Sequence, residues 1–208
     1  MKKKLLLLSL LLSAFTIDSI SQSIEITPYI GYTFGGKVYA KYGELKVQSS
    51  ESYGGTIGIV MPTNTSVQFE YFRQPTVGVY RDYFRPAEYN QTADLNIDWY
   101  QLGFFKQVPV SESVNPYGGI SLGATNFILK STPTSYDEWS FSIALQAGAK
   151  LYLSDRVGLR LHARLLMPIQ WGGFGFYAGT GGSGATASAG TYFIQGDVGA
   201  GLIIRLGT

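Results

Sequence analysis

The chain contains a single histidine, His162, which lies two residues from an arginine on either side, Arg160 and Arg164. A histidine that works as a general base needs a nucleophile such as serine and an orienting carboxylate within hydrogen-bond reach. The pattern of serines and carboxylates around His162 does not allow such a set to be assembled. We therefore interpret His162 as a packed interior residue and expect no catalytic residue in this chain.

The other candidate site residues are charged side chains that we expect to point to the interior with His162. Opposite charges removed from water should pair, because an unpaired buried charge is costly. We predict a network of salt bridges that fills the interior, and a narrow polar conduit is the alternative. The members of the predicted network are Glu70, Asp98, Lys150, Arg160, His162, Arg164, Asp197 and Arg205.

Other chemistry has little support. With one His and no Cys, only carboxylates are left to bind a metal, and Asp94, Asn96 and Asp98 at strand spacing are a weak calcium candidate. The run Gly179–Gly184 matches a dinucleotide fingerprint by its letters but has no helix pattern after it. No run of basic residues indicates a nucleic-acid partner. We expect no metal, no cofactor and no nucleic acid.

The stretch from Trp139 to Met167 predicts the elements that position these side chains. Every second residue is apolar on either side of Ser154–Arg156, and the residues between are small, polar or charged, such as Lys150 and Arg160. A period of two over more than ten residues excludes an amphipathic helix and predicts two long strands. One apolar face and one charged face suit lipid outside and a polar interior.

The same pattern predicts eight strands in all. The phase of the fourth strand is ambiguous, because apolar residues up to Trp99 are followed by Tyr100, Leu102 and Phe104 in the opposite phase. A β-bulge near Trp99 would reconcile the two phases, and so would an apolar end of the interior. The expected strands are 23–34, 53–61, 66–73, 92–107, 115–129, 139–153, 157–167 and 192–206.

The connections between these strands alternate in length. Residues 62–65, 108–114 and 154–156 make short turns, whereas 35–52, 74–91, 130–138 and 168–191 make long connections. Short turns at one end and long loops at the other are typical of outer-membrane β-barrels. Within the last long connection, 172–190 is dominated by small residues and is interpreted as a surface loop.

Aromatic residues and arginines gather in the second long connection. We interpret them as part of an aromatic girdle with arginines that contact lipopolysaccharide phosphates, or as a contact patch for a protein partner or a glycan. Trp99, Trp139 and Trp171 are likewise expected at the membrane interfaces. The patch consists of Tyr80, Arg81, Tyr83, Phe84, Arg85 and Tyr89.

The N-terminus has the features of an export signal. Three lysines precede an apolar run from Leu5 to Phe15, and Ser19 and Ser21 are suitable for a signal peptidase. We predict a signal peptide over residues 1–21 and one barrel domain over 22–208. Removing the signal takes away three lysines and one aspartate, so the formal net charge of +2 falls to about zero.

Three runs carry a resemblance to a known group: Pro116–Gly123, Gly148–Arg160 and the C-terminal Gly201–Leu206. In these runs the chain resembles the small outer-membrane β-barrel superfamily of Gram-negative bacteria, which includes the membrane domain of OmpA, the OmpX and OmpW types and the porin-family barrels of Bacteroidetes. The resemblance implies an eight-stranded antiparallel up-and-down transmembrane β-barrel. It also implies that outer-membrane lipid, lipopolysaccharide and the outer-membrane assembly machinery are partners.

Sequence and resemblance together favour a non-enzymatic barrel with a structural or interaction role through long extracellular loops, and a subunit of a larger outer-membrane complex is one form that this role can take. A narrow channel for small solutes is the alternative. A lipid-modifying barrel enzyme is disfavoured, because the lipid A deacylases have a Ser two residues after the His and this chain has Arg164 there. A soluble lipocalin-like barrel is a further alternative.

Overall fold

Twelve strands occupy most of the residues that the computed structural model describes, which are 23–40, 43–82, 91–111, 113–130, 135–169, 171–179, 182–189 and 194–206. The predicted signal peptide lies outside these residues. The strands are β1 (Ser23–Thr33), β2 (Gly36–Ala40), β3 (Gly43–Val47), β4 (Ser50–Val60), β5 (Thr65–Asp82), β6 (Gln91–Gln107), β7 (Val114–Lys130), β8 (Ser135–Tyr152), β9 (Val157–Ile169), β10 (Trp171–Gly179), β11 (Gly182–Ala189) and β12 (Gln195–Leu206).

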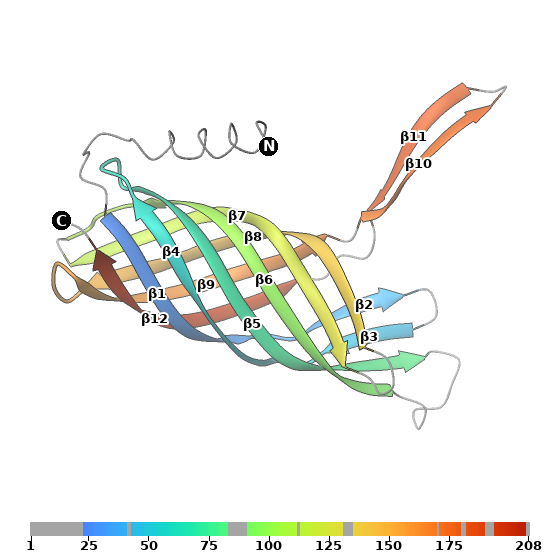
Figure 1. Ribbon diagram of the computed structural model, residues 1–208, viewed down its shortest axis with the longest axis horizontal. Coiled ribbons are helices and arrows are strands. Elements are labelled where there is room, and N and C mark those ends of the chain that lie inside the picture. Colours follow the sequence, from blue (N-terminus) through green and yellow to red (C-terminus); the bar gives the residue numbers. More distant parts are fainter. Residues whose placement is uncertain are drawn as a thin grey trace, which may run out of the picture.

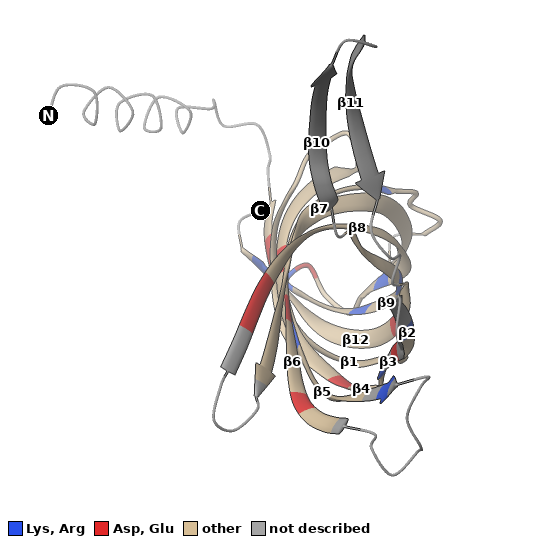
Figure 2. Ribbon diagram, turned by 90° about the vertical axis from the view of Figure 1, so that its right-hand side faces the viewer, with Lys and Arg blue, Asp and Glu red and all other residues tan. Residues whose placement is uncertain are grey.

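Eight of these strands close into an antiparallel barrel, as predicted. Their order is β5-β4-β1-β12-β9-β8-β7-β6, and pairing between β5 and β6 completes the ring. The ring of strands is seen from one end in Figure 2. Closure pairs the edges of the sheet, so no open backbone edge faces the apolar bilayer.

The short turns and both described ends of the chain lie at one end of the barrel, here called the turn end (Figure 1). The turns run from Met61 to Asn64, from Val108 to Ser113 and from Leu153 to Arg156, with Glu112 outside the described residues. In the first turn Asn64 takes a left-handed conformation with a φ of 56°, which asparagine tolerates better than most residues. The opposite end, to which β2, β3 and the last residues of β5 belong, is here called the loop end (Figure 1).

Two of the expected loops contain strands instead. Connection 35–52 forms a hairpin of β2 and β3, and β3 pairs with the end of β5 through Gly43–Val47 against Asp82–Gly78. The expected surface loop 172–190 contains β10 and β11, which pair as a separate two-stranded sheet. The predictions of loops there were wrong, because these strands are short or rich in small residues and lack the long apolar alternation that lipid imposes on a wall strand.

The faces of the wall strands follow the predicted alternation over most of the barrel. On β9, Leu159 and Leu161 are exposed on the outer face, whereas Arg160, His162 and Arg164 are buried in the interior. Of the residues that the structure describes, none belongs to a helix long and apolar enough to cross a membrane.

Candidate functional site

Arg164 on β9 is the centre of the polar interior, and its side chain is 0% exposed. Its guanidinium donates through Nη1 to Glu70 Oε1 at 2.6 Å and to the Tyr29 hydroxyl at 2.8 Å. It also donates to Asp197 Oδ1 through Nε at 2.8 Å and through Nη2 at 2.6 Å. Asp197 is the cross-strand neighbour of Arg164, but Glu70 and Tyr29 reach it from across the interior. One guanidinium therefore ties four strands together.

Asp197 on β12 is the second centre of this cluster. Its Oδ2 accepts hydrogen bonds from Thr33 Oγ1 at 2.8 Å and from Ser52 Oγ at 2.9 Å. His162 Nε2 lies 3.2 Å from Asp197 Oδ1. Serine and histidine thus both contact the carboxylate, whereas a nucleophilic triad needs the serine bonded to the histidine. The arrangement neutralises charge and is not that of an activated serine.

Glu25 on β1 forms a separate cluster close to the turn end. It accepts hydrogen bonds from Lys150 Nζ at 2.5 Å, from the Tyr152 hydroxyl at 2.7 Å and from Arg205 Nη2 at 3.1 Å. Lys150 is fully buried, whereas the Arg205 side chain is 26% exposed. Two cations therefore share one carboxylate near this mouth of the barrel.

Arg160 lies in the interior and is bound by neutral groups. It donates through Nε to the Tyr117 hydroxyl at 2.8 Å and through Nη1 to Gln68 Oε1 at 2.7 Å. Its guanidinium also lies 4.9 Å from the centre of the Tyr117 ring, at the distance of a cation–π contact. Tyr117 reaches it because residue 148 is glycine: a Cβ on Gly148 would lie 2.8 Å from the ring.

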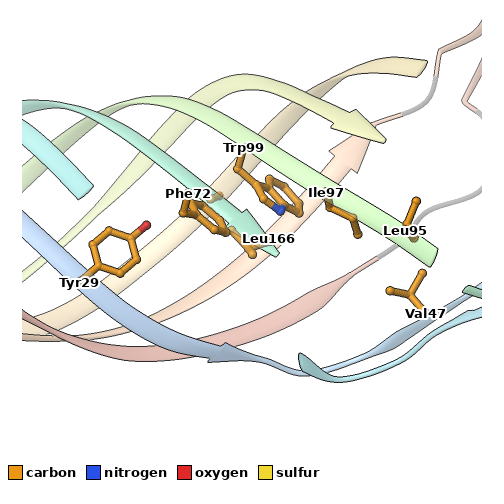
Figure 3. Close-up of a cluster of buried hydrophobic side chains, with 8 residues drawn as sticks. Tyr29, Val47, Phe72, Leu95, Ile97, Trp99 and Leu166 are labelled. Atoms are coloured by element: carbon orange, nitrogen blue, oxygen red, sulfur yellow. The ribbon is translucent and has the colours of Figure 1, made fainter. Parts of the chain in front are cut away.

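The interior near the loop end is apolar (Figure 3). Phe72 and Trp99 stack with ring centres 5.6 Å apart and planes 4° apart. The Arg164 guanidinium lies 4.1 Å from the centre of the Phe72 ring, so the apolar layer packs directly on the charged cluster. The buried members of this layer are Tyr29, Val47, Phe72, Leu95, Ile97, Trp99, Ala144 and Leu166.

This layer settles the phase of the fourth expected strand, β6. Its pairing with β5 and β7 runs without a bulge through Trp99. The apolar interior is therefore the correct alternative: Leu95 and Ile97 point inward, and Leu102 points out. Trp99 is 0% exposed, so its expected position at a membrane interface was wrong.

The same phase corrects the placement of Asp98. Asp98 points to the outer face of the barrel, where it pairs with its cross-strand neighbour Arg73 through Nε–Oδ1 and Nη2–Oδ2 distances of 2.6 Å each. Neighbouring side chains cover Asp98, so its own side chain is only 4% exposed. It belongs to no interior network, because the neighbouring Ile97 and Trp99 occupy the inward positions. On the turn side of this pair, the outer face carries Tyr71 and Tyr100, with ring centres 5.1 Å apart.

We expect Asp98→Asn to lower the free energy of unfolding by about 1–2 kcal/mol. The Asp98 side chain is only 4% exposed, but Arg73 is about a third exposed, so water can replace the lost partner of Arg73. Asp197→Asn is the matched comparison, and its cost should be at least twice as large, because the side chains of Asp197 and Arg164 are both 0% exposed and Arg164 keeps only Glu70 as a charged partner. Urea titrations of both variants in the same detergent measure the difference, and equal losses would contradict the outer position of Asp98.

The expected contact patch lies only partly within the described residues. Tyr80 and Arg81 belong to the end of β5, and Arg81 is exposed. Tyr83, Phe84, Arg85 and Tyr89 lie outside the described residues. On the outer wall, Trp139 is 57% exposed and stacks on Tyr100 at 5.6 Å, as expected for an interfacial tryptophan.

The sequence analysis missed three residues that organise the interior: Glu25, Tyr29 and Tyr117. Glu25 and Tyr29 lie on the face of β1 that alternates with Ile24, Ile26 and Ile30, and that face is buried. Their inward phase was the available signal, but it does not reveal which side chain they meet across the barrel. Within the described residues, no group of three or more His, Cys, Asp or Glu side chains is placed to share a metal ion.

Comparisons with known proteins agree with this architecture. Neisserial surface protein A superposes with a TM-score of 0.58 at 13% identity, covering 88% of this chain and 97% of that chain. OprG from Pseudomonas aeruginosa gives a TM-score of 0.61 at 11% identity, covering 90% and 97%. The outer-membrane protein AlkL gives 0.50 at 10% identity, covering 93% and 94%. These likenesses show the fold.

The sequence was also compared with proteins of curated function and with protein families. None of the curated proteins matches it. Residues 7–173 match the family described as "Outer membrane protein beta-barrel domain". Because this match covers most of the chain, the protein belongs to that family and is an integral β-barrel of the Gram-negative outer membrane.

Proposed function

We propose that this barrel is closed to ions and solutes and has a non-enzymatic, structural or interaction role carried by its loop end. The observation that carries the proposal is the filled interior, in which Arg164, Glu70 and Asp197 join opposite walls through buried ion pairs. An eight-stranded barrel is just wide enough for side chains to fill it. The charged cluster and the apolar layer on top of it are therefore two consecutive barriers.

The ion pairs make the polar barrier rigid. Moving Arg164 aside would separate it from two carboxylates in a region with little water, where lost ion pairs are expensive. Stacking on Phe72 holds the same guanidinium from the loop side. Opening a path along the axis would thus break contacts with several strands at once.

The interior also gives no support to an enzymatic role. His162 is buried, its Nε2 faces Asp197, and its ring lies edge-on against Tyr29 with ring centres 4.9 Å apart. It points away from the lipid face, where a lipid-modifying enzyme would need it. The loop end, in contrast, carries the β2–β3 hairpin and the projecting ends of β5 and β6 (Figure 1). Such a surface suits contacts with lipopolysaccharide or with a protein partner.

A narrow channel for small solutes is the second candidate. The observation that favours it is Gln74, which is fully buried in the interior and whose amide O and N both lack a hydrogen-bond partner among the described residues. Buried amides of this kind are usually satisfied by internal water. A water molecule at Gln74 would give a permeating solute a polar site inside the apolar layer.

Single-channel recording in planar bilayers separates the two candidates. The refolded protein is expected to give no conductance steps above those of protein-free bilayers, because both barriers must move before an ion can pass. A porin refolded by the same procedure serves as the positive control. Reproducible steps from the wild-type protein would overturn the closed barrel and establish the channel.

A further inference from the structure

Three cationic side chains stand together on the β-sheet that projects from the loop end. They are Lys37 on β2, Lys46 on β3 and Arg81 on β5. The register places Lys37 directly opposite Lys46, and Arg81 directly opposite Glu44. We call this group of three cations and Glu44 the loop-end cluster.

The loop-end cluster lies on the outer face of the sheet. Val47 is buried in the apolar layer of the interior, so its neighbour Lys46 must point the opposite way. Directly opposed residues share a face, which places Lys37 on the same side as Lys46. Glu44, two residues before Lys46, shares that face with its partner Arg81. All four charges therefore point away from the barrel axis.

The loop-end cluster contains three positive side chains and one negative side chain, so it has an excess of positive charge. Like charges directly opposite each other on neighbouring strands destabilise a sheet. Glu44 is the partner found for these cations among the described residues, and it lies 3.8 Å from Lys37 Nζ and 3.9 Å from Arg81 Nη1. Both distances exceed those of a good charge-assisted hydrogen bond. The cations thus keep donors that an external anion can use.

A hollow adjoins the two lysines. It has a volume of about 390 Å³ and is lined by Gly35, Gly36, Lys37, Lys46, Val47, Gln48 and Ser49. Hydroxyl and amide groups beside paired lysines suit a ligand that carries both negative charge and hydroxyl groups. A sugar bearing phosphate or carboxylate has this chemistry.

The distance of the loop-end cluster from the membrane interface indicates the source of such a sugar. Lys46 pairs with Val79, which lies eight residues beyond the interfacial Tyr71 on β5. At 3.3 Å per residue and a strand tilt near 40°, this places Lys46 about 20 Å farther out than Tyr71. The lipid phosphates lie closer to the aromatic girdle than this, and the core sugars of lipopolysaccharide fill the region above them.

We infer that the loop-end cluster binds the anionic core sugars of lipopolysaccharide in the surrounding leaflet, with Lys37 and Lys46 as the main anion-binding residues. The inference rests on the proposed interaction role of the loop end. It does not depend on whether the barrel conducts, because the cluster is outside the interior. Binding and conductance experiments can therefore fail independently of each other.

The test compares binding of two purified ligands to the refolded protein in detergent: lipopolysaccharide with a phosphorylated core, and lipid A, which lacks core sugars. Calorimetry at low ionic strength is expected to show that Lys37→Gln/Lys46→Gln weakens binding of the core-bearing ligand about tenfold, because two charge-assisted contacts are lost. The matched control is Lys106→Gln at the turn end, where Lys106 donates to the Thr63 carbonyl. It should bind like the wild type.

Each other outcome overturns the inference. If the double variant binds as tightly as the wild type, the lysines do not bind the ligand. If lipid A binds as tightly as the core-bearing form and loses affinity equally in the double variant, the ligand is a lipid phosphate. If soluble heparin binds tightly and core-bearing lipopolysaccharide does not, the source is not the surrounding leaflet. Both lysines are on the surface, so the double variant is expected to fold, and circular dichroism checks this.

Discussion

Arg164→Met is expected to lower the free energy of unfolding by about 3–5 kcal/mol, the usual cost of removing one partner from a buried ion pair. Methionine fills a similar volume, so lost packing contributes little. The main cost is that Glu70 and Asp197 remain in the interior without the guanidinium that neutralises them. Tyr29 loses its charged partner as well. Urea titration in detergent, followed by circular dichroism, measures the change.

A triple variant tests whether the unpaired carboxylates of Glu70 and Asp197 cause the loss of stability in Arg164→Met. Adding Glu70→Gln and Asp197→Asn to Arg164→Met removes all three charges, and we expect it to recover at least half of the loss. Replacing a complete buried ion-pair network by neutral groups is often neutral or stabilising. Asn and Gln also retain side-chain oxygens for Thr33, Ser52 and Tyr29. If the triple variant is less stable than Arg164→Met alone, the unpaired charge of Glu70 and Asp197 is not the cause of the loss.

The wall of the barrel could be predicted because lipid imposes a strict rule on it. From Trp139 to Met167 each outward position must be apolar, and the alternation therefore identifies both strands and their faces. Beyond the membrane the rule ends. β2 and β3 are short strands, β3 pairs with the end of β5, and the alternation in β3 covers only Leu45 and Val47, which is too short to identify a strand in the sequence.

The position of Asp98 shows a second limit. Alternation tells which residues share a face but not which face is inside when the interior itself is apolar. Leu95, Ile97 and Trp99 look like a lipid-facing series, yet they pack on Phe72 and Leu166 inside the barrel. Arg73 and Asp98 then lie on the outer face beside Tyr71 and Tyr100, where the part-exposed Arg73 covers the nearly buried Asp98.

The partners of the interior residues could not be predicted for a geometric reason. Arg164 and Asp197 are neighbours on adjacent strands, so their contact follows from the register of β9 with β12. Glu25 and Lys150 are on strands that do not pair with each other, and they meet only because closure of the ring sets the stagger of all eight strands. A strand pattern carries no information about that stagger.

Trp99→Ala is expected to cost about 3–5 kcal/mol, the typical loss for removing a large buried aromatic side chain. Trp99 is fully buried, stacks on Phe72 and fills the apolar layer between Ile97 and Leu166. The surrounding strands are fixed by backbone pairing on both sides, so the walls cannot collapse into the space. A cavity lined by apolar groups should therefore remain. Urea titration followed by circular dichroism measures the loss.

Trp99→Phe distinguishes the stability that is lost with side-chain volume from the stability that is lost with the indole N–H group. The indole Nε1 of Trp99 has no hydrogen-bond partner among the described residues, so the wild type already bears the cost of burying it. Phenylalanine removes that group and keeps the stack on Phe72, at the cost of a small cavity. We expect its stability to lie within about 1 kcal/mol of the wild type. A loss as large as that of Trp99→Ala would mean that the indole N–H is bonded inside the barrel, and would favour the hydrated interior that a channel requires.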